Sequence, residues 1–167
     1  MVLENQKDSQ KYAVFQIGQE NFGIEIGRVV EILGTQQIHA IPDLPDFLSG
    51  VITVRGQIIP LLDLRKRFGV LQSSGKELII VIKYDNEKLG VLVDQVKEIA
   101  TFKKNEVLNP PAIFKGLKRR YLAGLGKRGD KVVIILNVDD LLTSEERIML
   151  KEAEGVVEKD AGTEKSH

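Results

Sequence analysis

The 167-residue sequence contains no cysteine, which excludes disulfides, thiolate metal sites and thiol nucleophiles together. Histidine is almost as scarce: only His39 and His167 occur, and His167 ends a polar tail. Imidazole metal sites and Ser-His-Asp catalysis would therefore depend on His39 alone. No second ligand lies near His39 at the spacing of a zinc site, so we interpret it as a surface residue. We expect no metal and no cofactor.

An excess of charge of either sign is also absent, because 24 basic residues balance 24 acidic ones. A general nucleic-acid-binding protein is more often basic. No run of about 18 apolar residues occurs, so the sequence predicts no membrane insertion. The polar residues 1–11 lack the apolar core of a signal peptide. Together these absences predict a cytoplasmic protein, and a hydrophobic content of 43% supports a globular core.

What the sequence does contain is an internal repeat. Residues 22–26, FGIEI, correspond to residues 89–93, LGVLV, and the following VVEI at 29–32 corresponds to VKEI at 96–99 with the same spacing. A glutamate therefore occupies the same place in each copy. The simplest account is a duplicated β unit, which favours a body with two related surfaces over a single catalytic cleft.

A second pair of segments extends this repeat. Gly50-Val51 corresponds to Gly124-Leu125, and the LDL of residues 62–64 corresponds to the LNV of residues 136–138. The two pairs of segments align only when a gap is allowed between them. Glycines, apolar alternation and polar residues nevertheless keep their order in both copies.

Short apolar runs between turn residues predict many strands and few helices. Asp63 is predicted to cap a short helix over residues 64–68, and Thr143 with Glu146 fits a capping box for a terminal helix that fades after Ala153. This pattern predicts β-barrels or sandwiches. The predicted strands are residues 12–17, 22–26, 29–33, 51–54, 58–62, 78–84, 89–93, 96–99, 122–125 and 132–138.

A polar break at residues 72–76 is the predicted boundary between two modules. Modules of this size are marginally stable alone, so we expect them to share an apolar interface, and exchange of strands between them is left open. The expected organisation is a flexible leader over residues 1–10, one domain over 11–153 with modules over about 11–71 and 77–142, and a flexible tail over 154–167.

Arg55 and Glu31 are the first candidate site residues. Arg55 lies beside Gly56 between two apolar strands. A charged side chain at a hairpin tip is usually solvated and contributes little to stability or binding. From its position in the sequence alone, we favour this interpretation of Arg55. Alternatively, its planar guanidinium could bind carboxylates or carbonyls of a partner. Glu31 could protect a strand edge or contact a partner, and no second group pairs with it for general acid–base chemistry.

The apolar residues Ile26, Val29 and Ile32 recur at spacings of three. Burial in the core is the default interpretation of each. With a break in the strand at Gly27 and Arg28, one or more of them could instead line an exposed apolar groove. Such a groove is a natural seat for a partner helix.

Two other functions remain open at this point. An enzyme could use Glu31 or Asp94 as a base, which requires a pocket with a perturbed carboxylate. A nucleic-acid-binding β-barrel could use a basic cluster in which Tyr121 is the one interleaved stacking aromatic. That cluster consists of Lys115, Lys118, Arg119, Arg120, Lys127 and Arg128.

The stretch GVITVRGQIIPLLDLR at residues 50–65 resembles the signature of the CheW-type chemotaxis coupling proteins. The resemblance extends over about residues 11–150. The matching segments together are specific for the family, whereas any single one of them would be weak. The other matching segments, in order, are residues 22–24, 29–32, 41–42, 90–96, 121–126 and 136–137.

This resemblance implies two five-stranded, SH3-like β-barrels packed together, with a short C-terminal helix. It implies no enzymatic activity. Members of the family link the cytoplasmic tips of methyl-accepting chemoreceptors to the histidine autokinase CheA by binding the regulatory domain of the kinase. We would therefore expect a cytoplasmic protein that is recruited to receptor arrays at the inner face of the membrane.

The resemblance also implies roles for individual residues. Arg55 matches the most characteristic functional residue of the family, and Val29 and Glu31 match others. Ile26, Val29 and Ile32 match the apolar groove that receives the receptor hairpin. The family usually has Asn-Leu before the Arg-Gly, where this sequence has Thr53-Val54. Structural turns are predicted at Gly23, Gly50, Gly56, Gly90 and Gly124.

Overall fold

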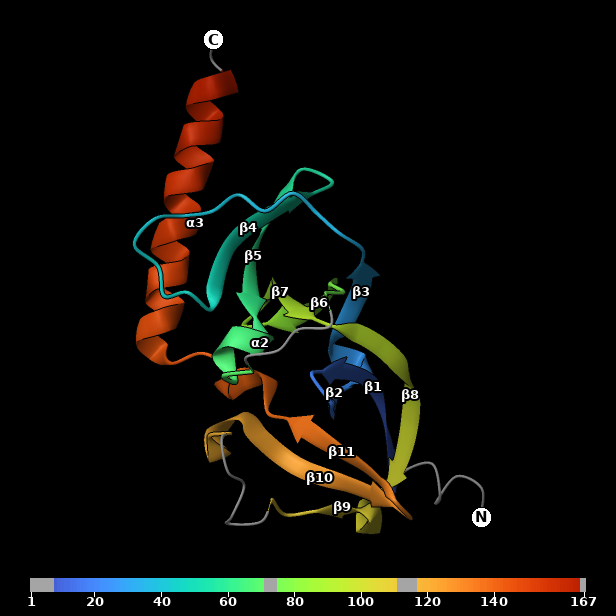
Figure 1. The fold of residues 1–167 in the computed structure, drawn as a ribbon. Coiled ribbons are helices and arrows are strands. Elements are labelled where there is room, and N and C mark those ends of the chain that lie inside the picture. Colours follow the sequence, from blue (N-terminus) through green and yellow to red (C-terminus); the bar gives the residue numbers. More distant parts are fainter. Residues whose placement is uncertain (1–7, 71–74, 111–116, 166–167) are drawn as a thin grey trace.

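The computed structural model describes residues 8–70, 75–110 and 117–165, with residues 156–165 described by their backbone alone. Residues 1–7 of the predicted leader, residues 72–74 of the predicted module boundary and His167 lie outside the described residues. Figure 1 shows two β-sheets one above the other, with a long C-terminal helix beside the upper sheet.

The first sheet has six strands in the order β8-β1-β2-β11-β10-β9 (Figure 1). Neighbouring strands are antiparallel, except that β2 and β11 are parallel. β1 begins at Ser9, which pairs with Lys103, so the predicted leader over residues 1–10 is too long at its C-terminal end. The strands are β1 (Ser9–Ile17), β2 (Glu20–Glu25), β8 (Gln95–Lys103), β9 (Val107–Leu108), β10 (Leu122–Arg128) and β11 (Lys131–Leu136).

The second sheet has five strands in the order β3-β6-β7-β5-β4. Only β5 and β7 are parallel neighbours. The predicted strands of the sequence are therefore confirmed in kind, and most differ only at their ends. The strands are β3 (Val29–Leu33), β4 (Leu48–Val54), β5 (Gln57–Asp63), β6 (Leu78–Tyr84) and β7 (Glu87–Val93).

Both sheets combine strands from the two copies of the repeat. In the first sheet, β1 and β2 pair with β8 and β11, and in the second sheet β3 and β5 pair with β6 and β7. β3 and β8 correspond in the repeat, and each pairs with the first strand of the other copy. Separating the two copies would therefore break strand pairs. The module limits of 11–71 and 77–142 stay a prediction about the repeat in the sequence.

The strand pairs do not close either sheet, which corrects the prediction of two closed, SH3-like barrels. In the first sheet, the one-turn helix η2 (Lys104–Glu106) separates edge strand β8 from the opposite edge strand β9, so the ladder is interrupted there. In the second sheet, edge strands β3 and β4 are joined by a long loop. Within that loop, His39 alone makes a bridge, to Val51 of β4.

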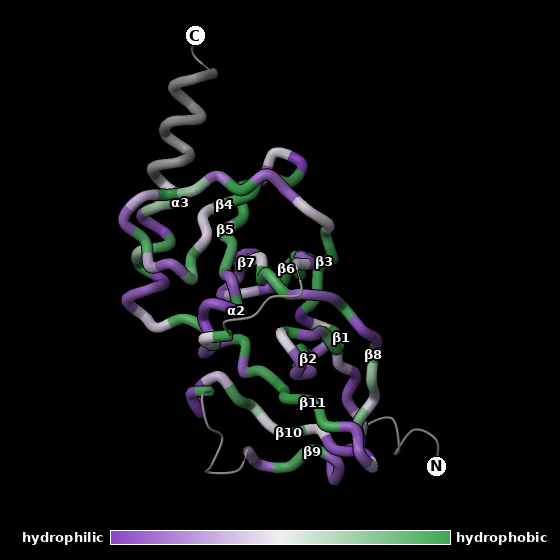
Figure 2. The backbone as a smooth tube through the Cα atoms, viewed as in Figure 1, coloured by the Kyte–Doolittle hydropathy of each residue, from purple (hydrophilic) through white to green (hydrophobic). Residues whose placement is uncertain are grey.

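The main hydrophobic core lies between the sheets, and each sheet also curves around a smaller cluster of its own. β6 shows why: Ile80 and Ile82 face the main core, while Ile79 and Val81 face the cluster inside the second sheet. A strand that is buried on both faces needs a continuous apolar run, and β6 has one in residues 78–82, LIIVI. Figure 2 shows hydrophobic colour (green) at β6. Burial of each such side chain stabilises the fold by about 1.5–3 kcal/mol.

The predicted turn glycines divide into two groups. Gly56, with φ of 79°, forms a hairpin turn together with Arg55, whose φ of 49° is also left-handed. Gly50 has φ of 134°, and a Cβ there would lie 2.2 Å from the carbonyl oxygen of His39. Gly50 lies inside β4, and the remaining three also lie inside strands, so only Gly56 is at a turn, which corrects the prediction. At each of the remaining three a Cβ would come within 3.2 Å of a neighbouring side chain: Gly23, Gly90 and Gly124.

Both predicted helix caps are confirmed. The Asp63 carboxylate accepts hydrogen bonds from the backbone N–H groups of Arg65 and Lys66 at the start of α2 (Leu64–Arg67). At the start of α3 (Ser144–Lys165), the Thr143 N–H donates to Glu146 Oε1 at 2.7 Å, and the Glu146 N–H donates to Thr143 Oγ1 at 3.1 Å. Each cap satisfies backbone donors that the helix itself leaves unpaired.

The helix α3 continues to Lys165, beyond the predicted end near Ala153. Among the residues of α3 whose side chains the structure describes, Ala153 is the last buried one, and each further residue of a helix adds a backbone hydrogen bond. Arg67 anchors the start of α3, because both its terminal nitrogens donate to the Glu146 carboxylate, at 2.9 and 2.7 Å. Burial alone would raise the pKa of Glu146, but these bonds and those with Thr143 hold it below its ordinary value. Flexibility of residues 154–167 stays a prediction.

Candidate functional site

Arg55 occupies the tip of the hairpin between β4 and β5. The left-handed backbone of Arg55 and Gly56 makes this turn tight, and the Arg55 side chain is 68% exposed. Its Nη2 donates to Oε1 of Glu31, on β3. The two leading candidates from the sequence are therefore in contact. Glu31 is partly covered, with a side chain that is 24% exposed, so the pair presents mainly the guanidinium to solvent.

This ion pair joins the two edges of the second sheet, since β3 and β4 are its first and last strands. The sheet must curve strongly for the tip of the β4–β5 hairpin to reach β3. Apolar contacts support that curvature: Leu33 of β3 packs against the cluster that includes Ile52 and Val54 of β4. An exposed ion pair contributes only about 0–1 kcal/mol. The apolar cluster therefore sets the curvature, and the ion pair holds the arginine in place.

Ile26, Val29 and Ile32 form an apolar strip along the edge strand of the second sheet. Ile26 lies in the one-turn helix η1 (Ile26–Arg28), which leads directly into β3. A β-bulge at Val30 shifts the strand register, so that Val29 pairs with Ile82 and Ile32 pairs with Ile80. Without the bulge, residues three apart would point to opposite faces. Ile82 and Ile80 both face the main core, so Val29 and Ile32 share that face.

The exposure of this strip increases along β3. Ile26 and Val29 are half-buried, whereas Ile32 is 47% exposed. An isoleucine on a strand edge with that exposure offers apolar surface that this chain does not cover. The structure thus places Val29 and Ile32 on one face of β3, with Ile26 in the one-turn helix directly before that strand, and their role as a binding groove stays a prediction.

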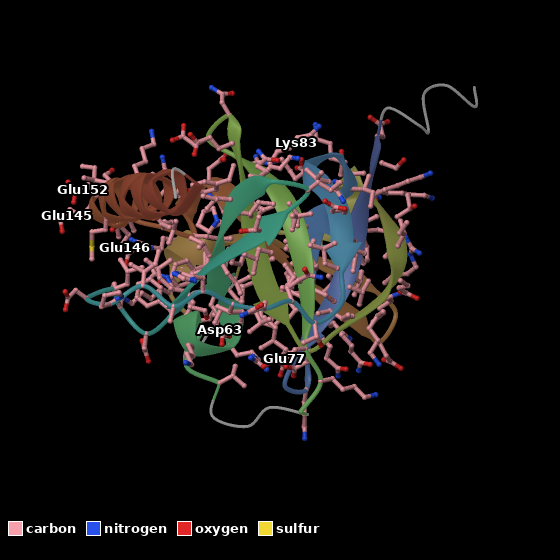
Figure 3. The ribbon with its side chains drawn as sticks, turned by 90° about the horizontal axis from the view of Figure 1, so that it is seen from above. Asp63, Glu77, Lys83, Glu145, Glu146 and Glu152 are labelled. Carbon is pink, nitrogen blue, oxygen red and sulfur yellow. The ribbon has the colours of Figure 1, made fainter. Side chains whose placement is uncertain are left out.

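A second strip, on β8, was missed as a site by the sequence interpretation. β8 has a bulge at Lys97 that corresponds to the bulge of β3, so Val96 pairs with Phe15 and Ile99 pairs with Ala13. Val96 packs against the main core, and Ile99 is 62% exposed. The repeat could have predicted this, because residues 96 and 99 correspond to 29 and 32. β3 and β8 run along the same side of the molecule in Figures 1 and 3.

Asp94, the other candidate base, is buried, and its contacts are with residues of the fold itself. It is 1% exposed, and its Oδ2 accepts a hydrogen bond of 2.8 Å from the backbone N–H of Gly18. Its Oδ1 lies 3.7 Å from Arg65, which also bonds Asp63 and Glu77 (Figure 3). Glu31 and Asp94 therefore lie in different environments, and each faces a positively charged arginine rather than a second acid or base.

The basic cluster is divided between the two ends of β10. Lys118, Arg119 and Arg120 precede this seven-residue strand, and Lys127 and Arg128 end it, about 20 Å away. Lys115 lies outside the described residues. Arg128 is paired with Glu106 at 3.1 Å, and a hydrogen bond from Arg128 lowers the pKa of Glu106. Arg120 lies 3.9 Å from Glu146. The cations do not form one continuous patch.

The described residues contain no group of three histidine, cysteine or acidic side chains that could hold a metal ion. In the same part of the chain, no helix has the length and apolar character needed to cross a membrane. The surface features are instead two exposed apolar strips on bulged edge strands and an arginine at a hairpin tip. These features are typical of a protein-binding β domain.

Comparison with known proteins assigns the domain to a family. A family model described as the CheW-like domain matches residues 11–146. The chain therefore belongs to the CheW-like family, as the signature around Arg55 predicted.

Individual relatives agree with this assignment. The chain is 33% identical to the chemotaxis protein CheW of Klebsiella aerogenes over 89% of this chain and 90% of that protein. It is 30% identical to CheW of Treponema pallidum over 79% and 81% of the two chains. The crystal structure of the scaffolding protein TtCheW from Thermoanaerobacter tengcongensis matches with a TM-score of 0.77 and 32% identity, over 82% of this chain and 94% of that one.

Proposed function

We propose that this protein is a non-enzymatic scaffold of bacterial chemotaxis, which couples chemoreceptors to the histidine autokinase CheA. The proposal is supported by membership of the CheW-like family and by relatives that are named chemotaxis proteins. The named scaffolding protein TtCheW, which shares the fold, supports it further. The protein would act in the cytoplasm, at receptor arrays on the inner face of the membrane.

The apolar strips are the proposed binding surface for the receptor. A receptor tip is a helical hairpin, and a helix presents apolar side chains at spacings of three and four along one face. Ile32 and Ile99 offer exposed apolar surface on corresponding edge strands, and Ile26, Val29 and Val96 continue that surface toward the core. Covering such a strip with a helix removes apolar area from water, which is the main favourable contribution to association.

Arg55 is the proposed polar anchor for the regulatory domain of the kinase. Among the described residues, only its Nη2 has a partner, Glu31, so the remaining donors of the fork are available to carboxylates or carbonyls of another protein. The left-handed turn places this fork at a rigid tip. Arginine held in this way loses little conformational freedom on binding, which favours affinity.

The scaffold would bind each partner modestly, so that it can exchange within arrays. A micromolar dissociation constant corresponds to about −8 kcal/mol, which a few apolar contacts and one or two polar anchors can supply. No chemistry is required of the protein in this role. Its contribution is geometric, because it holds two macromolecules at once.

The single observation that carries the proposal is the exposed Arg55–Glu31 pair on the family signature, beside the apolar strip of the same strand. The test is a pull-down with the purified kinase regulatory domain, using wild-type protein and the variants Arg55→Ala and Glu31→Ala. The repeat offers a matched control, Lys131→Ala, because Lys131 forms the corresponding ion pair with Glu98 in the first sheet.

We expect capture by the wild-type protein and by Lys131→Ala, and reduced capture by the Arg55 and Glu31 variants, all with unchanged circular dichroism. Loss of the circular dichroism signal in Arg55→Ala would make Arg55 a structural residue instead. Binding of nucleic acid is the alternative that the divided basic cluster disfavours. A filter-binding titration at two salt concentrations checks it, because phosphate binding weakens steeply with salt.

A further inference from the structure

Two ion pairs at the links before the exchanged strands connect the copies of the repeat, and their charges are reversed. Arg65 follows β5 of the first copy and lies 3.7 Å from Asp94, which follows β7 of the second copy. Asp139 follows β11 of the second copy and lies 2.8 Å from Arg28, which follows β2 of the first copy. Residues 65 and 139 correspond in the repeat. Arg28 and Asp94 both lie in the short links that precede the exchanged strands β3 and β8.

We call the Arg65–Asp94 pair the first junction and the Arg28–Asp139 pair the second junction. The two junctions differ in burial. At the first, the side chains of Arg65 and Asp94 are 10% and 2% exposed, and Arg65 also bonds Asp63 and Glu77. At the second, the Asp139 side chain is 68% exposed, and an open cavity of about 670 Å³ lies beside the pair. Figure 3 shows Lys83, which belongs to the second junction, on the opposite side of the molecule from Asp63 and Glu77.

Arg28 makes several contacts from one guanidinium. Its Nε and Nη2 donate to the carbonyl oxygen of Lys83, on β6, at 3.1 and 3.0 Å. Its Nη2 and Nη1 donate to the two oxygens of Asp139 at 2.8 and 3.4 Å. The hydrogen bonds from Arg28 lower the pKa of Asp139, because they stabilise the ionised form of its carboxylate. One side chain thus ties η1 to two elements of the second copy.

These contacts lie at the start of the apolar strip. Arg28 is the last residue of η1 and is followed directly by Val29, and Ile26 begins the same one-turn helix. β3 is an edge strand, held by β6 on one side only. The position of the strip relative to β8 therefore depends on what fixes η1, and Arg28 is the polar contact that does so across the two copies.

We propose that Arg28 and Asp139 are a positioning pair, which holds η1 and β3 so that the strip on β3 and the strip on β8 are presented together to one partner helix. The inference builds on the proposed function, because the partner helix is the receptor tip. Preorganisation of this kind strengthens binding without any contact to the partner, since the free protein already has the bound geometry. Removing the pair leaves the core intact, because neither side chain is part of it.

The first test uses the free protein and needs no partner. Amide hydrogen exchange is measured in β3 for the wild type, Arg28→Ala, Asp139→Ala and the double variant. We expect the amides of β3 to exchange about fivefold faster in each variant, with the double variant no faster than Arg28→Ala, because Arg28→Ala already removes the contact that Asp139→Ala removes. Glu106→Ala is the matched control, since it breaks an exposed ion pair, with Arg128, that does not touch β3. Unchanged exchange in β3 overturns the inference.

The second test measures binding of a soluble fragment of a chemoreceptor cytoplasmic tip. We expect the Arg28 and Asp139 variants to bind it about fivefold more weakly, Arg28→Lys to recover part of the loss, and capture of the kinase regulatory domain to stay unchanged in all of them. Faster exchange in β3 with unchanged binding of the fragment also overturns the inference. If the wild type itself does not bind the fragment, the proposed receptor coupling fails, while the exchange result still decides whether the pair positions β3.

Discussion

Glu31 and Glu98 occupy the same place in the repeat, and each bonds a cation on the hairpin near the far edge of its own sheet. In the second sheet the cation is Arg55, at the left-handed tip of the β4–β5 hairpin, with its side chain 68% exposed. In the first sheet it is Lys131, the first residue of β11, with its side chain 37% exposed. The tip of that second hairpin is Gly129, with φ of 59°, followed by Asp130.

The difference separates a structural feature from a candidate functional one. An ion pair between a glutamate on an edge strand and a basic residue on the distant hairpin occurs in both sheets. Because both sheets are curved, we interpret this ion pair as a structural feature of the curved sheet. A guanidinium at the tip itself occurs only in the second sheet. A planar fork of donors and a compact ammonium are not equivalent in recognition, so the two halves present different surfaces although they share one backbone plan.

The largest expected effect tests the two junctions between the copies. Arg65→Ala leaves Asp63 and Asp94 as buried, unpaired charges, and we expect it to lower the free energy of unfolding by about 3–5 kcal/mol and the Tm by about 10 °C. Arg28→Ala acts at the exposed junction and should cost at most about 1 kcal/mol. Urea unfolding of both variants measures the contrast. Equal losses would mean that burial does not distinguish the junctions.

The next prediction compares corresponding glycines. Gly50→Ala must place a Cβ 2.2 Å from a backbone oxygen at a positive φ, so we expect a loss of about 3 kcal/mol in the free energy of unfolding. At Gly124 the nearest atom, at 2.8 Å, belongs to the Val107 side chain, which can move, so Gly124→Ala should lose about 1 kcal/mol. Thermal unfolding monitored by circular dichroism gives both values, and the reverse order would contradict this interpretation of the repeat.

A third prediction concerns the apolar strips. Ile32→Asp and Ile99→Asp change exposed residues, so stability should stay within about 0.5 kcal/mol of wild type. Each should weaken binding of the receptor-tip fragment about 30-fold, as a central apolar contact of about 2 kcal/mol does. Isothermal titration calorimetry measures this. An effect of Ile32→Asp alone would restrict the partner to the second sheet.

The smallest expected effect is on the stability of the ion-pair variants. Arg55→Ala and Lys131→Ala each remove an exposed cation, and we expect each to lower the free energy of unfolding by less than about 1 kcal/mol. The two variants should therefore be matched in stability and differ only in partner binding. A loss of several kcal/mol in Arg55→Ala would show that the pair with Glu31 holds the sheet together, which would weaken Arg55 as a binding residue.

Much of the local structure was predictable because it depends on neighbouring residues. The capping groups Asp63 and Thr143 were recognised from their spacing to the backbone groups that they satisfy, and Gly56 from its place between two apolar strands. The roles of Gly23 and Gly90 were not, because a close approach between strands depends on which strands become neighbours. The length of α3 was missed because an apolar pattern reports packing, whereas backbone hydrogen bonds extend a helix without any apolar pattern.

The candidate site divides in the same way. The family signature singled out Arg55 and Glu31, and the spacing of the apolar residues marked the strip on β3. Their contact depends on the curvature of a five-stranded sheet, whose edges bring residues from β3 and the β4–β5 hairpin together. The strip on β8 was present in the repeat but became a candidate only when its bulge and the exposure of Ile99 were known.

Residue types at short or repeated spacings are enough to predict the duplicated β plan, the helix caps and membership of the CheW-like family. The exchange of β3 and β8 between the two copies, the faces that the bulges expose, and the contacts of Arg28 with Asp139 and of Arg65 with Asp94 depend on long-range packing instead. Those contacts join residues far apart in the chain, and they exist only where the packing of two curved sheets around one core brings the residues together.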